Sequence, residues 1–148
     1  MARAKTPRTL HDLPVVKGFR PMWMRTNYRQ AITLNLEEYE AIRLVDYESM
    51  TQDEAGELMG VSRPTVTRIY ESARKKLALA LVEGRTFVIE GGSVEIAYGI
   101  YQCEECEHRV QLPTDEPMPE VCIACGSEKM ISLEDCFVRG CRRCRRCR

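Results

Sequence analysis

The stretch at residues 52–71, QDEAGELMGVSRPTVTRIYE, constrains the fold more than any other part of the chain. Its pattern predicts two helices joined by a tight turn. Thr51 and Glu54 have the spacing of a capping box at the start of the first helix. Gly60 falls where such a turn often needs a left-handed backbone, and Ser62 suits the cap of the second helix.

The outward side of the second helix indicates DNA binding. An ordinary helical hairpin would share much of the pattern, but short polar and basic residues here replace the Glu/Lys mixture that is typical of a solvated helix. The N-terminus of such a helix usually meets base edges. We expect Arg63 and Thr67 to read base edges, and Arg68 and the N–H end at Ser62 to contact phosphates. The predicted DNA-contact residues are Ser62, Arg63, Pro64, Thr65, Thr67, Arg68 and Lys75.

Charge is segregated along the chain, although the 22 basic and 22 acidic residues cancel. Residues 1–35 carry seven Lys/Arg and one Asp, and residues 61–86 carry six bases and two acids. Residues 36–60 and 87–135 are acidic, and the last thirteen residues hold six arginines and no acid. Affinity for nucleic acid follows the local potential. Phosphate contacts are therefore expected from the N-terminal arm, the second motif helix and the tail.

A three-helix core is predicted around the motif. Residues 33–47 read as a first helix, capped by Asn35, whose acidic residues face outward. Gly56 is small where the two motif helices must approach closely. The second motif helix continues to about Val82 before Gly84 ends it. Its end needs an apolar partner, either the N-terminal arm or a second protomer, because it carries Leu77, Leu79 and Leu81.

The segments that flank the helices are predicted to be extended. Residues 1–30 are basic, contain three prolines and read as an arm. Four of its residues are expected to lie across the helical core, namely Phe19, Met22, Trp23 and Met24. Residues 85–101 alternate around Gly91 and Gly92, which predicts a β-hairpin or two short strands.

Two Cys-x2-Cys pairs, separated by fifteen residues, predict a structural metal site. Two such turns supply four thiolates in the tetrahedral arrangement that suits one structural zinc ion. A redox pair would need a βαβ setting, which is not visible, and His108 is not needed as a ligand. The predicted ligands are Cys103, Cys106, Cys122 and Cys125. The surrounding acidic surface favours contact with a protein, such as RNA polymerase or this chain's own basic segments, over contact with nucleic acid.

The C-terminal tail, CFVRGCRRCRRCR, carries four further cysteines. They are Cys136, Cys141, Cys144 and Cys147. Three alternatives remain open: free thiols on a basic tail, a second zinc or iron–sulfur site, and a redox switch.

Residues 14–92 resemble the prokaryotic domain-of-unknown-function family 134 of predicted DNA-binding proteins. The matching blocks are LNLEEYEAIRLVDYESMTQDEAGELMGVSRPTVTRIYESARKKLALALVEGR, VIEGG and LPVVKGFRP. The motif itself is similar to the DNA-binding fourth region of bacterial sigma factors. The resemblance implies a helix-turn-helix that reads promoter or operator DNA. The cysteine pairs and the tail lie outside it, so their interpretation rests on spacing alone.

The sequence thus predicts a mainly α fold in four parts. These are a basic arm (1–30), a three-helix helix-turn-helix domain (31–92), a small β zinc ribbon (93–135) and a Cys/Arg-rich tail (136–148). The expected function is sequence-specific binding of double-stranded DNA by a transcriptional regulator, with a homodimer as one possibility. The rivals are a protein-interaction adaptor that uses the ribbon and a metal or redox sensor that uses the tail. No enzyme site is recognisable, and the absence of a signal or membrane segment favours the cytoplasm.

Overall fold

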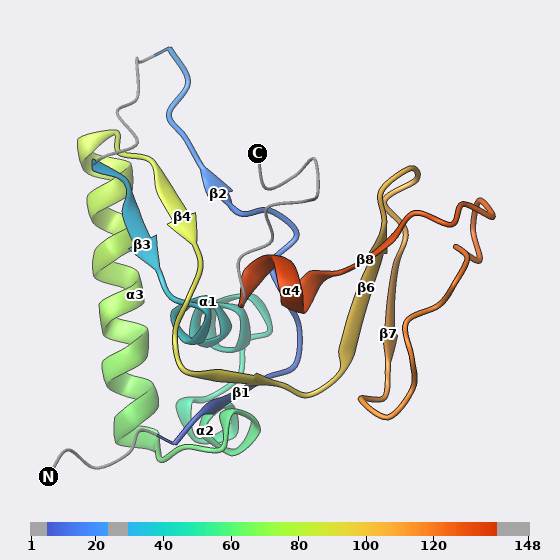
Figure 1. The fold of residues 1–148 in the computed structure, drawn as a ribbon. Helices are drawn as coiled ribbons and strands as arrows, with labels where there is room; N and C mark the ends of the chain where they lie inside the picture. The colour runs from blue at the N-terminus through green and yellow to red at the C-terminus, as the bar shows by residue number, and fades with distance from the viewer. Residues whose placement is uncertain (1–5, 24–29, 139–148) are drawn as a thin grey trace, which may run out of the picture. The chain divides into compact units, whose positions relative to one another are not determined.

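The computed structural model describes residues 6–23 and 30–138, which fall into two compact units (Figure 1). Among these residues, the helical unit comprises 6–10, 14–23 and 30–95, and the ribbon unit comprises 11–13 and 96–138. None of the described helices is long and apolar enough to cross a membrane.

The helical unit combines helices with short strands. Its strands are β1 (Arg8–Leu10), β2 (Gly18–Phe19), β3 (Ile32–Leu34), β4 (Phe87–Ile89) and β5 (Val94–Ile96). Its helices are α1 (Leu36–Ile42), continued by the π-helical turn η2 (Arg43–Tyr47), α2 (Gln52–Met59) and α3 (Arg63–Glu83). One sheet has the order β2-β4-β3, with β4 antiparallel to β2 and parallel to β3, and β1 pairs with β5.

The ribbon unit is a three-stranded antiparallel sheet followed by a short helix. Its elements are β6 (Gly99–Cys103), β7 (Arg109–Leu112), β8 (Met130–Ser132) and α4 (Leu133–Phe137). The strand order is β7-β6-β8. Strand β6 is therefore the central strand, and it ends at Cys103, the first cysteine of the first Cys-x2-Cys pair.

The prediction of a mainly α fold is wrong. The described residues contain four α-helices and eight strands in three sheets, which is a mixed α/β architecture. Of the two alternatives for residues 85–101, the hairpin is wrong, because β4 and β5 lie in different sheets, whereas the two short strands are present. Gly91 and Gly92 have φ angles of 71° and 107° and lead the chain away from β4, so that β5 can pair with β1.

The first predicted helix begins later than expected and buries two of its acids. Thr33 lies in β3, and α1 starts at Leu36 after an Asn35 capping box. The acidic residues were expected to face outward, yet Glu38 and Glu40 are 4% and 0% exposed. Burial is tolerated because both carboxylates have hydrogen-bonded partners on α3 or within the same helix.

The predicted motif is confirmed in its local geometry. The Thr51–Glu54 capping box is formed, and Gly60 and Gly84 end their helices in the left-handed conformation. The buried cluster that joins the three helices comprises Ala41, Leu44, Ala55, Met59 and Val66. The motif helices therefore share one apolar core.

Replacing Gly56 by alanine is expected to destabilise the helical unit by about 1–3 kcal/mol, as overpacking does. A Cβ at this position would lie 2.8 Å from the carbonyl oxygen of Val61, which is a backbone atom and cannot rotate away. The free energy of unfolding in urea measures the effect. A Gly91→Ala variant reports the strain of a positive φ alone, because no atom lies within 4 Å of its added Cβ. A fully stable Gly56→Ala protein would contradict the crowding argument.

The N-terminal segment is partly built into the fold. Leu10 of β1 is fully buried, and β1 is paired through a hydrogen bond from Arg8 N to Ser93 O. The expected apolar cover over the helices is wrong for the described residues: Phe19, Met22 and Trp23 are 61%, 82% and 101% exposed. Phe19 instead lies against Phe87 across the β2–β4 pair. Met24 lies outside the described residues.

Candidate metal centre and nucleic-acid interface

The two Cys-x2-Cys pairs converge on one point of the ribbon unit. The four Sγ atoms of Cys103, Cys106, Cys122 and Cys125 all lie within 4.8 Å of one another. The Sγ separations are 3.6 Å for Cys103–Cys125 and 3.5 Å for Cys106–Cys122. A disulfide would need about 2 Å, whereas a tetrahedron with metal–sulfur bonds of about 2.3 Å has edges of about 3.8 Å. The four thiols therefore have the geometry of a tetrathiolate metal site.

Two equivalent backbone turns hold the four cysteines. In each turn, the backbone N–H of the first cysteine donates to the carbonyl oxygen of the residue five positions later. The carbonyl oxygen of the same cysteine accepts from the N–H of the residue four positions later. The bonds are Cys103 N to His108 O and Glu107 N to Cys103 O, and Cys122 N to Ser127 O and Gly126 N to Cys122 O. Glu107 and Gly126 occupy the same place with φ angles of 63° and 74°. Only Gly126 was recognisable in the sequence, since glutamate seldom signals a left-handed residue.

Backbone N–H groups around the sulfur atoms favour the thiolate form. The N–H of Cys106 is the main cause that lowers the pKa of Cys103 to about 7. Burial opposes ionisation of Cys122, but the N–H groups of Ala124 and Cys125 outweigh it and lower its pKa. The N–H of Ser127 acts in the same sense on Cys125, yet the neighbouring thiols, Cys106 foremost, raise its pKa to about 12. The four sulfur atoms thus differ in how readily they ionise, and a bound cation would favour the thiolate form of all four.

The arrangement can hold a metal ion with four cysteine ligands. Cys103 and Cys122 are buried and belong to the core of the unit with Met130, while Cys106 and Cys125 are exposed. In the second predicted cysteine set, Cys136 is buried within α4. Its other members, Cys141, Cys144 and Cys147, lie outside the described residues.

The N-terminal end of α3 presents most of the predicted DNA-contact residues to solvent. Ser62, Arg63, Pro64, Arg68 and Lys75 are exposed, while Thr65 and Thr67 are half-buried. Ser62 occupies the N-cap position, and its hydroxyl lies 3.0 Å from that of Thr65. The structure therefore places Ser62, Thr65 and Arg68 close to one helix end, with Lys75 two turns further along.

Two of the predicted contacts are already engaged with α2. Arg63 forms an ion pair with Asp53 at 3.5 Å, in which both side chains are about two-thirds exposed. The Thr67 hydroxyl donates to the side-chain carbonyl of Gln52, the first residue of α2, and is also 3.1 Å from Arg63 O. An exposed ion pair is worth about 0–1 kcal/mol, so Arg63 can exchange its partner for another acceptor.

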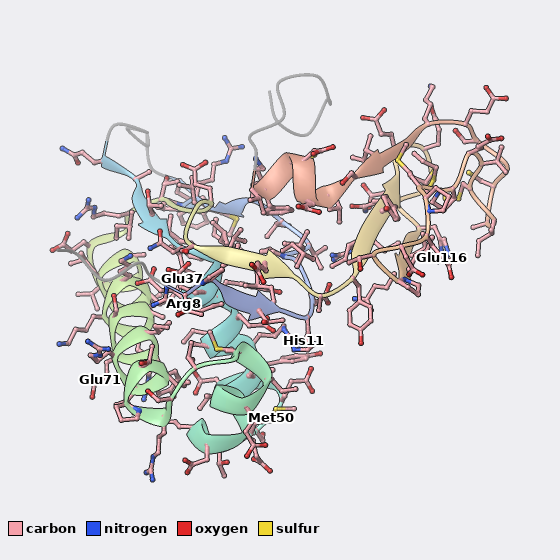
Figure 2. The ribbon with its side chains drawn as sticks, turned by 60° about the horizontal axis from the view of Figure 1, so that its bottom comes forward. Arg8, His11, Glu37, Met50, Glu71 and Glu116 are labelled. Atoms are coloured by element: carbon pink, nitrogen blue, oxygen red, sulfur yellow. The ribbon has the colours of Figure 1, made fainter. Side chains whose placement is uncertain are left out.

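A groove of about 390 Å³ lies between β1, the start of α1 and α3. It is lined by Arg8, Asn35, Glu37, Glu38, Thr65, Arg68, Ile69 and Ser72. Figure 2 shows Arg8 and Glu37 side by side next to α3. Arg8 Nε and Glu37 Oε2 are buried, and no described residue supplies either atom with a hydrogen-bond partner. The groove was missed at the sequence level, because β1 was read as part of a free arm.

Glu38 fixes the start of α1 to the middle of α3. Its carboxylate accepts hydrogen bonds from Ser72 Oγ at 2.6 Å, Lys76 Nζ at 2.7 Å and Asn35 N at 2.8 Å. These contacts set the orientation of α3 relative to α1. The spacing Asn35-x2-Glu38 predicts the capping contact of this network. No feature of the neighbouring sequence predicts the contacts of Glu38 with Ser72 and Lys76.

The chain matches a protein-family model described as "Protein of unknown function DUF134" over residues 1–97. The UPF0251 protein of Chloroherpeton thalassium is 39% identical over 134 residues, covering 90% of this chain and 88% of that protein. The UPF0251 protein of Clostridium novyi is 37% identical over 134 residues, covering 90% of both chains. No solved structure matches the chain. Because the family model matches well over half of the sequence, this chain belongs to the DUF134 family.

Proposed function

We propose that this chain is a sequence-specific DNA-binding protein that acts as a transcriptional regulator. The observation that supports this most is the exposed N-terminal end of α3, which follows a left-handed turn at Gly60 and is set against α2 as in a helix-turn-helix. The residues at this end are short, polar and basic, which suits entry into a major groove.

In this proposal, the engaged and unengaged side chains have different roles. Arg63 exchanges its weak pair with Asp53 for a guanine edge, where a bidentate arginine discriminates by about 1–3 kcal/mol. Arg68 and Arg8 line the same groove, and their guanidinium groups would supply positive charge for a DNA phosphate. Thr67 is held by Gln52 and positions the first turns of α3.

The metal in this proposal is one zinc ion with a structural role. Four thiolates, two buried and two exposed, form a closed tetrahedral set, and such sites hold small β ribbons together in other proteins. Thiolates of this kind require a reducing setting, which fits the cytoplasm.

Selection of duplexes from randomised DNA tests this function. At about 150 mM salt, the zinc-loaded chain is expected to enrich one motif. Arg63→Ala should lose affinity for that motif by about 5- to 100-fold while its affinity for random duplex stays nearly constant, since a base contact is lost. Lys129→Ala removes the same charge from the ribbon unit and serves as the control, with little effect expected. Equal losses of Arg63→Ala on the motif and on random DNA would refute its assigned role.

A second candidate function, a protein-interaction adaptor, is favoured by one observation. Met118, Val121 and Ile123 are 44%, 48% and 81% exposed beside the metal site and are surrounded by exposed acids. Such a patch suits a basic protein surface. Retention of RNA polymerase by the wild-type chain and not by a Met118→Asp variant, without any enrichment of DNA, would favour this function.

A further inference from the structure

The solvent-facing side of α3 changes character along its length. Over the first turns it is polar and basic, and it includes Arg63 and Arg68, whereas Lys75 lies in the second half of the helix, one turn before Leu79. Over the last two turns it becomes apolar, with Leu81 and Val82 84% and 83% exposed. Ala78 and Leu79 are also exposed on this stretch, and none of the described residues of the N-terminal segment covers it. The apolar end therefore lies far from the DNA-contact end of the same helix.

Further exposed apolar residues lie at this end of the helical unit. Phe87 follows the α3 cap by three residues, and the ring of Phe19 lies against it at 5.3 Å. Phe19 is 61% exposed, and Phe87 is half-buried. Stable interfaces bury about 800 Å² on each partner, more than the four exposed α3 residues could supply alone, so these neighbours would enlarge the contact. A patch of this kind marks an interaction surface.

We infer that this surface binds a second copy of the chain through an antiparallel crossing of the two α3 helices. Lys75, Leu79 and Glu83 follow one another at four-residue spacing along one side of α3. A two-fold axis at Leu79 brings Lys75 next to the partner's Glu83 and places apolar residues between the two charged pairs. Glu83 pairs with Arg85 in the single chain at 3.5 Å, and both are partly exposed, so the partner can compete for it. The face is thus complementary to itself.

The geometry of this dimer matches DNA. The centre of residues 63–68 lies 13.5 residues from Leu79, or about 20 Å at about 1.5 Å per residue. Two antiparallel helices would therefore present their N-terminal ends about 40 Å apart, and crossing of the axes shortens this distance. Half-sites on one face of a duplex are about 34–36 Å apart. This spacing argument rests on the proposed function, whereas the dimer itself does not.

Sedimentation of the zinc-loaded full chain without DNA tests the dimer. The expected mass of the wild-type chain at micromolar concentration is twice 17.0 kDa. Leu79→Asp with Val82→Asp, at two exposed residues on the side of α3 that faces the axis, should raise the dimer dissociation constant by about 100-fold or more, because each dimer would bury carboxylates in an apolar contact. Val15→Asp, at a residue 69% exposed elsewhere in the helical unit, is the matched control and should remain dimeric.

Exchanging the charges of Lys75 and Glu83 tests the dimer without changing any apolar residue. Lys75→Glu should weaken the dimer, and the double variant Lys75→Glu with Glu83→Lys should restore it. A wild-type chain that is monomeric at every concentration, or a dimer that survives Leu79→Asp with Val82→Asp, would overturn the inference. If the dimer forms but no DNA motif is enriched, the proposed function fails while the interface stands. If a motif is enriched, it should be an inverted repeat with half-sites one helical turn apart.

Discussion

Removing metal from the four-cysteine centre is expected to unfold the ribbon unit while the helical unit stays folded. The buried cluster at the centre consists of two ligands, Cys103 and Cys122, together with Met130. Beyond this cluster the unit buries only a small further set of apolar residues, namely Leu13, Ile100, Leu133 and Phe137, and domains of this size usually need a metal or a disulfide in addition to such a core. Structural zinc in small domains contributes about 10–16 kcal/mol of apparent binding free energy, most of which is folding free energy. The amide NMR spectrum after chelation should therefore lose the dispersed resonances of residues 98–135 and keep those of α1 to α3.

Cysteine variants separate loss of the metal from loss of a thiol. Cys106→Ser removes an exposed ligand and should abolish stoichiometric zinc binding. Cys136→Ser changes a buried cysteine outside the centre, so one zinc per chain should remain. Zinc added back to the chelated wild-type chain should restore the spectrum. A ribbon unit whose spectrum is unchanged without metal would show that the cysteine cluster is not the source of its stability.

The sequence revealed those features whose cause is local. The Thr51–Glu54 capping box, the turns at Gly60 and Gly84 and the close approach at Gly56 each depend on a few neighbouring residues, and all are present. The spacing of the cysteines likewise predicts the two Cys-x2-Cys turns. A single ion with four thiolate ligands would require the two turns to converge, which is why the cysteine cluster was predictable without knowledge of the sheet that carries it.

The strands and the buried acids depend on partners that are distant in sequence. Strands of two or three residues are too short to show a periodicity, and β4 is defined by β2 and β3, more than fifty residues before it. Glu38 looks like a solvated first-turn acid until α3 brings Ser72 and Lys76 to it. Arg8 looks like part of a free arm until β5 pairs with its strand. Each error concerns a contact that only the complete fold supplies.

Replacing Glu38 by alanine is expected to destabilise the helical unit by about 3–5 kcal/mol. The side chain is 6% exposed, and its loss leaves Lys76 Nζ, Ser72 Oγ and Asn35 N without their acceptor. Because Lys76 is one-third exposed and remains partly solvated, we expect a loss of stability near the lower end of this range. Urea unfolding followed by far-UV circular dichroism, with the metal site saturated, measures the change. The midpoint should fall while the slope with urea stays constant.

Glu71→Ala is the matched control, because Glu71 is an exposed acid on the outer side of α3 (Figure 2). Its loss should change the stability by no more than about 0.5 kcal/mol. The two variants also separate stability from DNA contact. At temperatures where Glu38→Ala remains folded, a looser tie between α1 and α3 should weaken the DNA binding proposed above by changing the orientation of α3, since no residue proposed to contact DNA is altered. Stability equal to that of Glu71→Ala would mean that the buried carboxylate network does not hold the two helices together.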